Sequence, residues 1–282
     1  MKNKFYVIST PIGNIQEVNQ RMINALKECK YLLSEDTRVT QKFLRLIDFQ
    51  GEWPTLISYH KFNEKNKLNE LLELIENNCC GLVSDAGYPA ISDPGQIIIQ
   101  ALRENLPTIQ VEVINCANAA ICALVGSGFI NNSFYFAGFL DKKTTAAIKQ
   151  LQKLKTINST LILYESVHRI QTTLECIDSI FSSQQICVAR ELTKQNETYY
   201  FGTAKQIGKE LTLKGEFVII IDNNSCESKQ IETLNDSHLQ AVTELENLGV
   251  KTKLACKYVA DKHQLNNSTL YNQIQKLKNN KK

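Results

Sequence analysis

The chain alternates short apolar segments with amphipathic ones, and this alternation limits the folds that it can adopt. In the first half, apolar runs predict strands at residues 5–9, 31–34, 81–84 and 110–114. Apolar residues at helical spacing predict helices at residues 19–27, 37–47, 66–76 and 95–105. A strand–helix rhythm of this kind predicts a largely parallel sheet covered by helices.

The pattern restarts after a run of small residues at 115–128. Further strands are predicted at residues 134–139, 160–164, 185–189 and 216–221, and helices at 144–154 and 170–180. We therefore expect a domain boundary within 115–133, with one α/β domain at 1–120 and a second at 121–224. A polar stretch at 222–236 predicts a linker to a third domain at 235–282.

The last segment is helical and basic. Two apolar stripes and a third segment, with Ser268 as its N-cap, predict three helices, and the short connection at 263–267 fits a helix-turn-helix. The whole chain carries a net charge of +3, yet the stretch from Lys251 onward holds eight Lys and a single acid, Asp261. A basic end favours a polyanionic partner, with a solvated cap of packed helices as the alternative.

Composition excludes several classes of protein. Hydrophobic residues make up 43% of the chain, but no apolar run approaches the roughly 18 to 20 residues that a membrane span needs. The 9 Cys are odd in number, scattered, and without a Cys-x-x-Cys pair, which indicates a reducing, cytoplasmic location. No Cys/His group has the spacing of a zinc site, so we expect no metal. Phosphate-binding glycine motifs and a nucleophile elbow are also missing from the sequence.

Polar, Gly- and Pro-containing loops follow five predicted strands. They lie at residues 9–14, 35–38, 85–95, 164–169 and 190–194. Taken singly, each has a structural explanation: Asp36 as a helix cap, 93–95 as a turn, and Arg190 with Glu191 as a surface ion pair. Because ligand sites in open parallel sheets form beyond the carboxyl ends of the strands, five loops at equivalent positions favour one shared site.

These loops, in this order, resemble the family of bacterial 16S rRNA (cytidine 2'-O)-methyltransferases, within the tetrapyrrole methylase superfamily. The resemblance covers about residues 5–221. The matching stretches are residues 10–14, 34–38, 58–60, 82–95, 136–140, 164–169, 189–194 and 214–216. The family also carries a C-terminal helix-turn-helix, which fits residues 252–278 and favours RNA contact by the basic end.

The resemblance implies a fold of two α/β domains of the tetrapyrrole methylase type with S-adenosylmethionine in the cleft between them, plus a C-terminal helix-turn-helix-like appendage. It implies methylation of the ribose 2'-hydroxyl of a cytidine in the decoding region of 16S rRNA, on the small ribosomal subunit. Relatives act as homodimers without a metal. The alternatives are a catalytically inactive RNA-binding relative and a small-molecule methylase of the tetrapyrrole kind.

The resemblance also places residues at the site. A ribose hydroxyl is a weak nucleophile and needs a base or an acceptor, and a phosphate or carboxylate needs a cation. The candidates for these roles are Glu35, Asp36, Arg38, His60 and Asp93. The expected cofactor-binding residues are Pro11, Gly13, Asp85, Ala86, Gly87, Ile91, Ser92, Asn115, Cys116, Ala117, Glu165, Ser166, Ala189, Arg190 and Glu191.

One loop departs from the family pattern. Residues 115–119 read Asn-Cys-Ala-Asn-Ala where relatives usually carry Pro-Gly-Pro-Ser-Ala. The loss of two Pro and a Gly frees the backbone and adds side chains beside the cleft. We therefore expect weaker or displaced binding of S-adenosylmethionine, and this departure motivates the inactive alternative.

Overall fold

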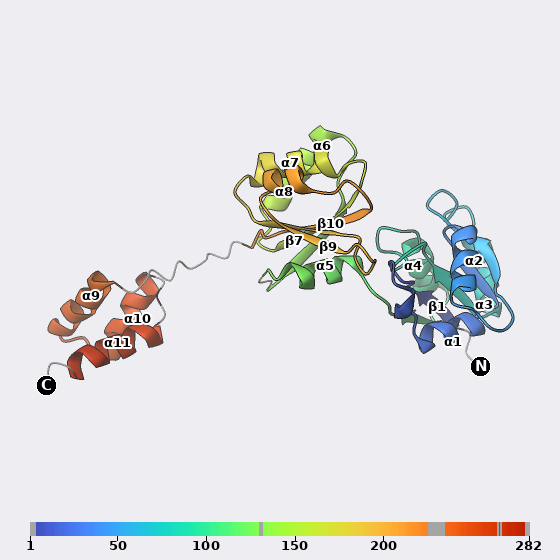
Figure 1. Ribbon diagram of the computed structural model, residues 1–282. Coiled ribbons are helices and arrows are strands. Elements are labelled where there is room, and N and C mark those ends of the chain that lie inside the picture. The colour runs from blue at the N-terminus through green and yellow to red at the C-terminus, as the bar shows by residue number, and fades with distance from the viewer. Residues whose placement is uncertain (1–3, 130–131, 225–234, 264, 266, 280–282) are drawn as a thin grey trace. The chain divides into compact units, whose positions relative to one another are not determined.

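The computed structural model describes residues 4–129, 132–224, 235–263, 265 and 267–279 (Figure 1). The chain divides into two compact units, Met1–Asp222 and Asn223–Lys282. The larger unit holds two five-stranded sheets, and the smaller one is helical.

The first sheet is parallel throughout, in the order β3-β2-β4-β1-β5. Its strands are β1 (Lys4–Ile8), β2 (Tyr31–Ser34), β3 (Thr55–Ser58), β4 (Cys80–Val83) and β5 (Gln110–Ile114). Its helices are the short 3-10 helix η1 (Ile15–Glu17), α1 (Gln20–Glu28), α2 (Thr37–Leu46), α3 (Leu68–Asn77) and α4 (Gln96–Asn105). The predicted parallel sheet and its four α-helices are confirmed. The sequence pattern missed β3, a short edge strand with no fully buried residue.

The second sheet is mixed, in the order β6-β7-β10-β8-β9. Its strands are β6 (Phe134–Phe139), β7 (Thr160–Ser166), β8 (Ile186–Arg190), β9 (Thr198–Gly202) and β10 (Glu216–Ile221). Only β6 and β7 pair in parallel, so the expectation of a largely parallel sheet is wrong here. The connection at 191–197 is too short for a parallel crossover, which forces β9, another strand that the pattern missed, to run back along β8.

Four helices accompany the second sheet: α5 (Ala119–Ser127), α6 (Thr144–Lys155), α7 (Ile170–Phe181) and α8 (Ala204–Glu210). The sequence predicted α6 and α7 but neither α5 nor α8. Small residues such as Ala120, Ala123 and Gly126 give α5 no apolar stripe, because the helix is apolar on all sides. Asn118 caps it, since its side chain accepts a hydrogen bond from the Ile121 N–H at 3.0 Å.

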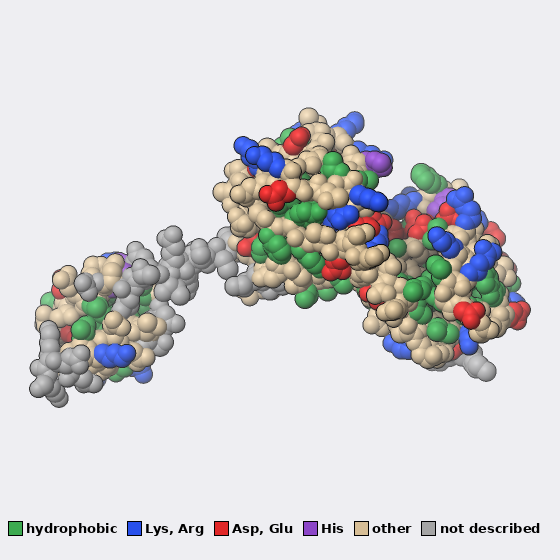
Figure 2. Space-filling view, in the orientation of Figure 1, with side chains coloured by type: hydrophobic (Ala, Val, Ile, Leu, Met, Phe, Trp, Pro, Cys, Tyr) green, Lys and Arg blue, Asp and Glu red, His purple; other side chains and the backbone are tan. Residues whose placement is uncertain are grey.

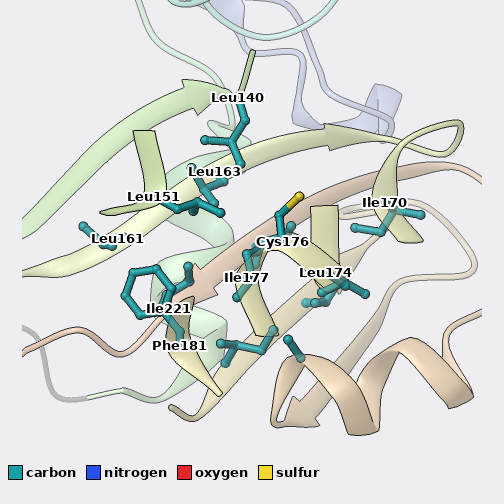
Figure 3. Packing of buried hydrophobic residues seen from close by; sticks show 14 of the residues in the cluster. Leu140, Leu151, Leu161, Leu163, Ile170, Leu174, Cys176, Ile177, Phe181 and Ile221 are labelled. Atoms are coloured by element: carbon teal, nitrogen blue, oxygen red, sulfur yellow. The ribbon is translucent and has the colours of Figure 1, made fainter. Parts of the chain in front are cut away.

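Alternation of side chains along the strands gives each sheet a core on both faces. In β1, Phe5 and Val7 pack with α3 and α4, while Tyr6 and Ile8 pack with α1 and α2. In the second sheet, one face carries α6, α7 and α8 over an aliphatic core that includes Leu163 (Figure 3), and the other face packs against α5. Cores on both faces hold the strand ends, and the loops after them, in place.

The smaller unit consists of α9 (Asp236–Asn247), α10 (Thr252–Lys262) and α11 (Asn267–Asn279) around its own core, and the three predicted helices are confirmed. Helix α11 begins at Asn267, and the capping role predicted for Ser268 rests on a side chain that lies outside the described part of the structure. In the described part of the chain, no helix has the length and hydropathy required to cross a membrane.

Candidate active site

The loops after β1, β2 and β4 meet at one edge of the first sheet, because these strands are parallel neighbours. The backbones of Thr10 and Gly87 exchange two hydrogen bonds, at 2.9 and 3.0 Å, which join the first loop to the third. The Asp36 N–H donates to Asp85 Oδ1 at 3.1 Å, which joins the second loop to the third. Three segments distant in the sequence thus form one wall.

The second sheet contributes a wall of a different kind. Strands β7 and β8 both pair antiparallel with β10, so they run in the same direction and their carboxyl ends share an edge with the beginning of β10. The register places Glu216 opposite Ser166, and Phe217 opposite both Glu165 and Arg190. Residues that begin a strand therefore stand beside residues that end one.

A cavity of about 390 Å³ is lined from both sheets. It brings together nine residues that the sequence predicted for the site: Glu35, Asp85, Ala86, Gly87, Ile91, Ser92, Asp93, Glu165 and Ser166. It is also lined by nine that the sequence did not single out: Ile12, Tyr88, Asn118, Ala119, Phe139, Tyr164, Glu216, Phe217 and Val218. Most of these nine are direct neighbours of the matching motifs or lie within them. The β10 residues Phe217 and Val218 were not predicted, because they lie near the beginning of a strand and the sequence predicts site residues only after strands.

The other predicted site residues do not line this cavity. They are Pro11, Gly13, Asp36, Arg38, His60, Asn115, Cys116, Ala117, Ala189, Arg190 and Glu191. Several lie directly beside lining residues. Pro11 and Gly13 flank Ile12, and a Cβ on Gly13 would collide with the Lys194 side chain, so this glycine permits the two loops to approach closely.

Residues 115–118 are held in place despite the missing prolines. The Asn115 carbonyl accepts a hydrogen bond from Asn19 Nδ2 at 3.0 Å, and the Cys116 carbonyl accepts one from the Tyr88 hydroxyl at 3.3 Å. Asn118 then caps α5 and lines the cavity. Hydrogen bonds and a helix cap thus order residues 115–118 where relatives carry prolines, and the expected effect of this loop on S-adenosylmethionine binding stays a prediction.

Arg190 and Glu191 do not line the cavity but make hydrogen bonds that support its second wall. Arg190 is only 8% exposed, so the interpretation as a surface ion pair is wrong. Its Nε donates to the Lys214 carbonyl at 2.7 Å. Glu191 Oε1 accepts hydrogen bonds from Lys194 Nζ at 2.9 Å and from the Glu216 N–H at 3.1 Å. These contacts fix the beginning of β10 against the end of β8.

Asp36 is occupied by helix capping. Its Oδ1 accepts a hydrogen bond from the Arg38 N–H at 2.9 Å, and Arg38 Nη2 lies 2.6 Å from Oδ2. These hydrogen bonds lower the pKa of Asp36 to about 2. The interpretation as a helix cap is therefore confirmed. His60 lies after β3, outside the cavity lining, and its buried Nδ1 has no hydrogen-bond partner in the described structure.

Three carboxyl groups line the cavity wall formed by the first sheet. Burial raises the pKa of Asp93 to about 7, the negative charges of Glu35 and Asp85 add to the increase, and the positive charge of Lys61 opposes it. Burial, followed by the charge of Asp85, raises the pKa of Glu35. Burial also raises the pKa of Asp85, against the hydrogen bond from the Asp36 N–H. Asp93 is thus a carboxyl group whose pKa lies near neutrality.

The opposite wall holds a carboxylate that is already paired. Glu165 is buried, and its Oε2 accepts a hydrogen bond from the Thr173 hydroxyl at 2.6 Å and lies 3.6 Å from Arg169 Nη2. Its Oε1 accepts a hydrogen bond from the Ser166 N–H at 2.8 Å. Glu165 therefore orders the end of β7 rather than presenting a free base.

The cavity has the size and chemistry of a small-molecule site. Its volume falls within the roughly 300–1,000 Å³ of ligand pockets, and apolar side chains such as Ile91 and Phe139 stand beside a few polar groups. Gly87, Ala90 and Ser92 all have positive φ, at 76°, 69° and 67°. Glycine adopts such a φ without strain, but Ala90 and Ser92 do not. Backbone strain clusters at ligand sites, and here it accompanies a loop of small residues against which a cofactor can lie closely. Among the described residues, no group of three or more His, Cys, Asp or Glu has the arrangement of a metal site.

Comparison with known proteins places the chain in a family. Residues 4–208 match the family of tetrapyrrole (corrin/porphyrin) methylases. A ribosomal RNA small subunit methyltransferase I from Mycoplasma pneumoniae is 44% identical over 266 residues, which are 94% of this chain and 96% of that protein. The protein of the same name from Halalkalibacterium halodurans is 37% identical over 96% of this chain and 94% of its own length.

Solved structures share the fold at low identity. The methyltransferase CobJ superposes with a TM-score of 0.58 at 16% identity, covering 78% of this chain and 93% of CobJ. A uroporphyrin-III-C-methyltransferase from Thermus thermophilus gives a TM-score of 0.54 at 18% identity, over 79% of this chain and 96% of that one. The chain therefore belongs to the tetrapyrrole methylase family, in the branch whose curated members are named ribosomal RNA small subunit methyltransferase I.

Proposed function

We propose that this chain transfers a methyl group from S-adenosylmethionine to the ribose 2'-hydroxyl of one cytidine in the decoding region of 16S rRNA. The observation that carries the proposal is the acidity of Asp93 and its place in the cavity wall. Asp93 is a carboxyl group with a pKa of about 7 in the wall of a ligand-sized cavity, on a chain whose relatives are named as methyltransferases of the small-subunit rRNA.

The cavity residues fit the cofactor. We propose that the backbone at Ala86 and Gly87, together with Ile91, Ser92 and Ser166, holds S-adenosylmethionine. The bound cofactor supplies a methyl group on a positively charged sulfonium, and its transfer requires the accepting oxygen to lie in line with the breaking bond. Carboxyl groups on one wall favour a cation in the cavity.

Asp93 is our proposed base. A group with a pKa near 7 is substantially ionised at neutral pH and is still basic enough to accept the proton of a hydroxyl as the oxygen is methylated. Asp36 is a poor base, because Arg38 and the α2 backbone occupy its oxygens and its pKa is about 2. Glu165 is committed to Thr173 and Arg169.

The helical unit is our proposed RNA-binding appendage. Lys253, Lys257 and Lys262 are exposed on α10, as are the apolar side chains of Leu254 and Tyr258. Exposed cations can neutralise phosphates, and an exposed aromatic ring can stack on a base.

We also propose a homodimer. Helix α5 exposes Ile121 and Val125, the latter 75% exposed, and the adjacent edge strand β9 exposes Phe201. A Cβ on Gly126 would collide with the Tyr199 ring, which shows how closely α5 packs beside β9. Burying these apolar side chains against a second copy would remove them from water. Sedimentation should then give a dimer for the native chain and a monomer for Val125→Lys.

The described structure favours an active enzyme over the alternatives. An inactive relative was suggested by the changed loop at 115–119, yet this loop is hydrogen-bonded and Asn118 and Ala119 line the cavity. A small-molecule methylase shares the fold, but the tetrapyrrole enzymes resemble this chain at 16–18% identity against 44% for the rRNA enzyme. The described cysteines are all free, which supports a reducing, cytoplasmic location.

Nucleoside analysis of 16S rRNA tests the proposal. In cells that lack this gene, the chain should restore one 2'-O-methylcytidine, and Asp93→Asn produced at the same level should not. If the native chain fails where a related enzyme succeeds in the same cells, the proposed activity is wrong.

A further inference from the structure

Helix α2 and the loop after β3 carry an unusual set of exposed side chains. Arg38, Lys42 and Arg45 follow one another at helical spacing on the exposed face of α2, and α2 contains no acidic residue. In the neighbouring loop, the Phe62 side chain is 93% exposed, and Lys65 lies three residues further on. We call these five residues the α2–Phe62 surface.

This surface adjoins the acidic wall of the cavity. Ser34 at the end of β2 pairs with Ser58 at the end of β3, so the two following segments leave the sheet side by side. The Tyr59 N–H donates to the Ser34 carbonyl at 2.8 Å. Further along the same loop, Lys61 Nζ donates a hydrogen bond to the carbonyl of Ser92, which lines the cavity. A polymer bound on this surface would therefore reach the cavity without crossing either sheet.

The cations of this surface are available to a ligand. Lys42, Arg45 and Lys65 make no ion pair with any residue that the structure describes. Arg38 is paired with Asp36, but its side chain is 88% exposed. Blue side chains are visible over α2 in Figure 2. Phosphate groups at the spacing of a nucleic-acid backbone complement such a row of cations.

Phe62 has no role in a core. Phe62 is 93% exposed, so its ring is accessible to a ligand. Its ring neighbour is His60, at 6.0 Å between ring centroids, while Lys61 and Lys65 flank it in the sequence. An isolated aromatic ring among cations is the composition of single-stranded RNA sites, in which bases stack on the ring and phosphates meet the cations.

We propose that the α2–Phe62 surface binds a single-stranded RNA segment next to the target nucleotide, with phosphates along α2 and one base on Phe62. This inference rests on the proposed function and assigns part of its substrate site. RNA is favoured over a protein partner because protein interfaces are depleted of Lys, whereas Lys42 and Lys65 of this surface make no ion pair with any described residue.

Two matched charge reversals test the cationic part. The full-length protein is titrated with small ribosomal subunits from cells lacking this gene, at several KCl concentrations. K42E/R45E should weaken binding at least tenfold at low salt and reduce the slope of log affinity against log salt by about 1 to 2, for two lost phosphate contacts. The control K149E/K153E changes the net charge equally on the exposed part of α6 and should leave the slope unchanged. Equal losses from both variants would overturn the proposal.

Phe62 supplies the second test. Phe62→Ala should weaken binding by about 5- to 100-fold, the range for one lost base stack, and Phe62→Trp should retain it. An unchanged affinity for Phe62→Ala would overturn the stacking role. Naked 16S rRNA should distinguish the variants in the same order as the intact subunit does. If only intact subunits distinguish them, the surface meets a ribosomal protein and the proposal is wrong.

The two proposals can fail separately. If the native chain binds subunits through this surface but methylates nothing, the proposed enzymatic function fails and the surface stands. The native chain could instead methylate its cytidine while K42E/R45E and Phe62→Ala both keep the native KM for the small subunit. The proposed function would then be correct, and the proposed RNA-binding surface would be wrong.

Discussion

Glu35 and Asp93 lie in the wall of the same cavity, and the negative charge of Glu35 adds to burial in raising the pKa of Asp93 to about 7. The two carboxyls come from different loops, one after β2 and one after β4. Parallel pairing of these strands brings them together. The sheet topology therefore tunes the acidity of the proposed base.

Asp93→Asn should remove the proposed base. We expect methyl transfer to fall by about 10²- to 10⁴-fold, because general-base assistance is lost. Binding of S-adenosylmethionine, measured by calorimetry, should persist. In the native enzyme only the ionised carboxyl accepts a proton, so the rate should increase with pH up to about 7 and then level off. A flat profile from pH 5.5 to 8.5 would contradict the assignment.

Two substitutions should move that profile in opposite directions. Glu35→Gln removes a negative charge that raises the pKa of Asp93, so the ascending limb should shift to lower pH. Lys61→Met removes a positive charge that lowers the same pKa, so the limb should shift to higher pH. Single-turnover rates across pH give both midpoints. Shifts in the same direction, or none, would show that another group titrates.

Asn118→Ala should remove the cap of α5. The Asn118 side chain accepts the Ile121 N–H, and the loss of such a cap costs about 1 kcal/mol. Asn118→Ser, which keeps an oxygen at this position, should lose much less. Urea denaturation of both variants provides the comparison. Equal stabilities would mean that the cap does not support the changed loop at 115–119.

Gly95→Ala should destabilise the loop that carries Asp93. Gly95 has a φ of 137°, and an added Cβ would lie 2.7 Å from Leu82 Cδ2. Gly51→Ala is the control, because Gly51 has a φ of 114° with nothing within 4 Å of the added Cβ. Backbone strain costs about 1–3 kcal/mol at either position, and only Gly95→Ala adds a collision. The thermal midpoint should therefore fall further for Gly95→Ala, and the reverse order would refute this packing argument.

Removal of residues 223–282 should weaken RNA binding but leave the cavity and its cofactor binding intact. The larger unit has its own cores, so it should remain folded and bind S-adenosylmethionine. Binding to the small subunit should weaken, and its dependence on salt should become shallower, because the lysines of α10 are lost. A salt slope identical to that of the full chain would argue against an RNA role for the helical unit.

The sequence predicted the first sheet well because its strands are apolar and its helices have one apolar face. It failed where these signals are weak: β3 has no buried residue, and α5 is apolar on all sides. The strand–helix pattern predicts parallel strands, so it predicted neither the antiparallel pairs of the second sheet nor a site residue such as Phe217 at the beginning of β10. A rule that follows the ends of parallel strands cannot find a residue at the beginning of β10.

For the site, the motifs predicted which loops meet but not which side chains face the cavity. Asp36 and Asp93 look equivalent as acidic residues in matching loops. The structure separates them, because Asp36 caps α2 and pairs with Arg38, whereas Asp93 is half-buried beside two other carboxyls. Burial and hydrogen bonding depend on the fold, so no pattern of residue types alone distinguishes these two carboxyls.

Transfer of labelled methyl groups from S-adenosylmethionine to purified small subunits is the most direct test of the central claim. The subunits come from cells lacking this gene, and the rRNA is digested and mapped. We predict label on the 2'-oxygen of a single cytidine in the decoding region, dependent on Asp93. Label on a base, label on a small molecule, or no transfer where a related enzyme is active would contradict the account.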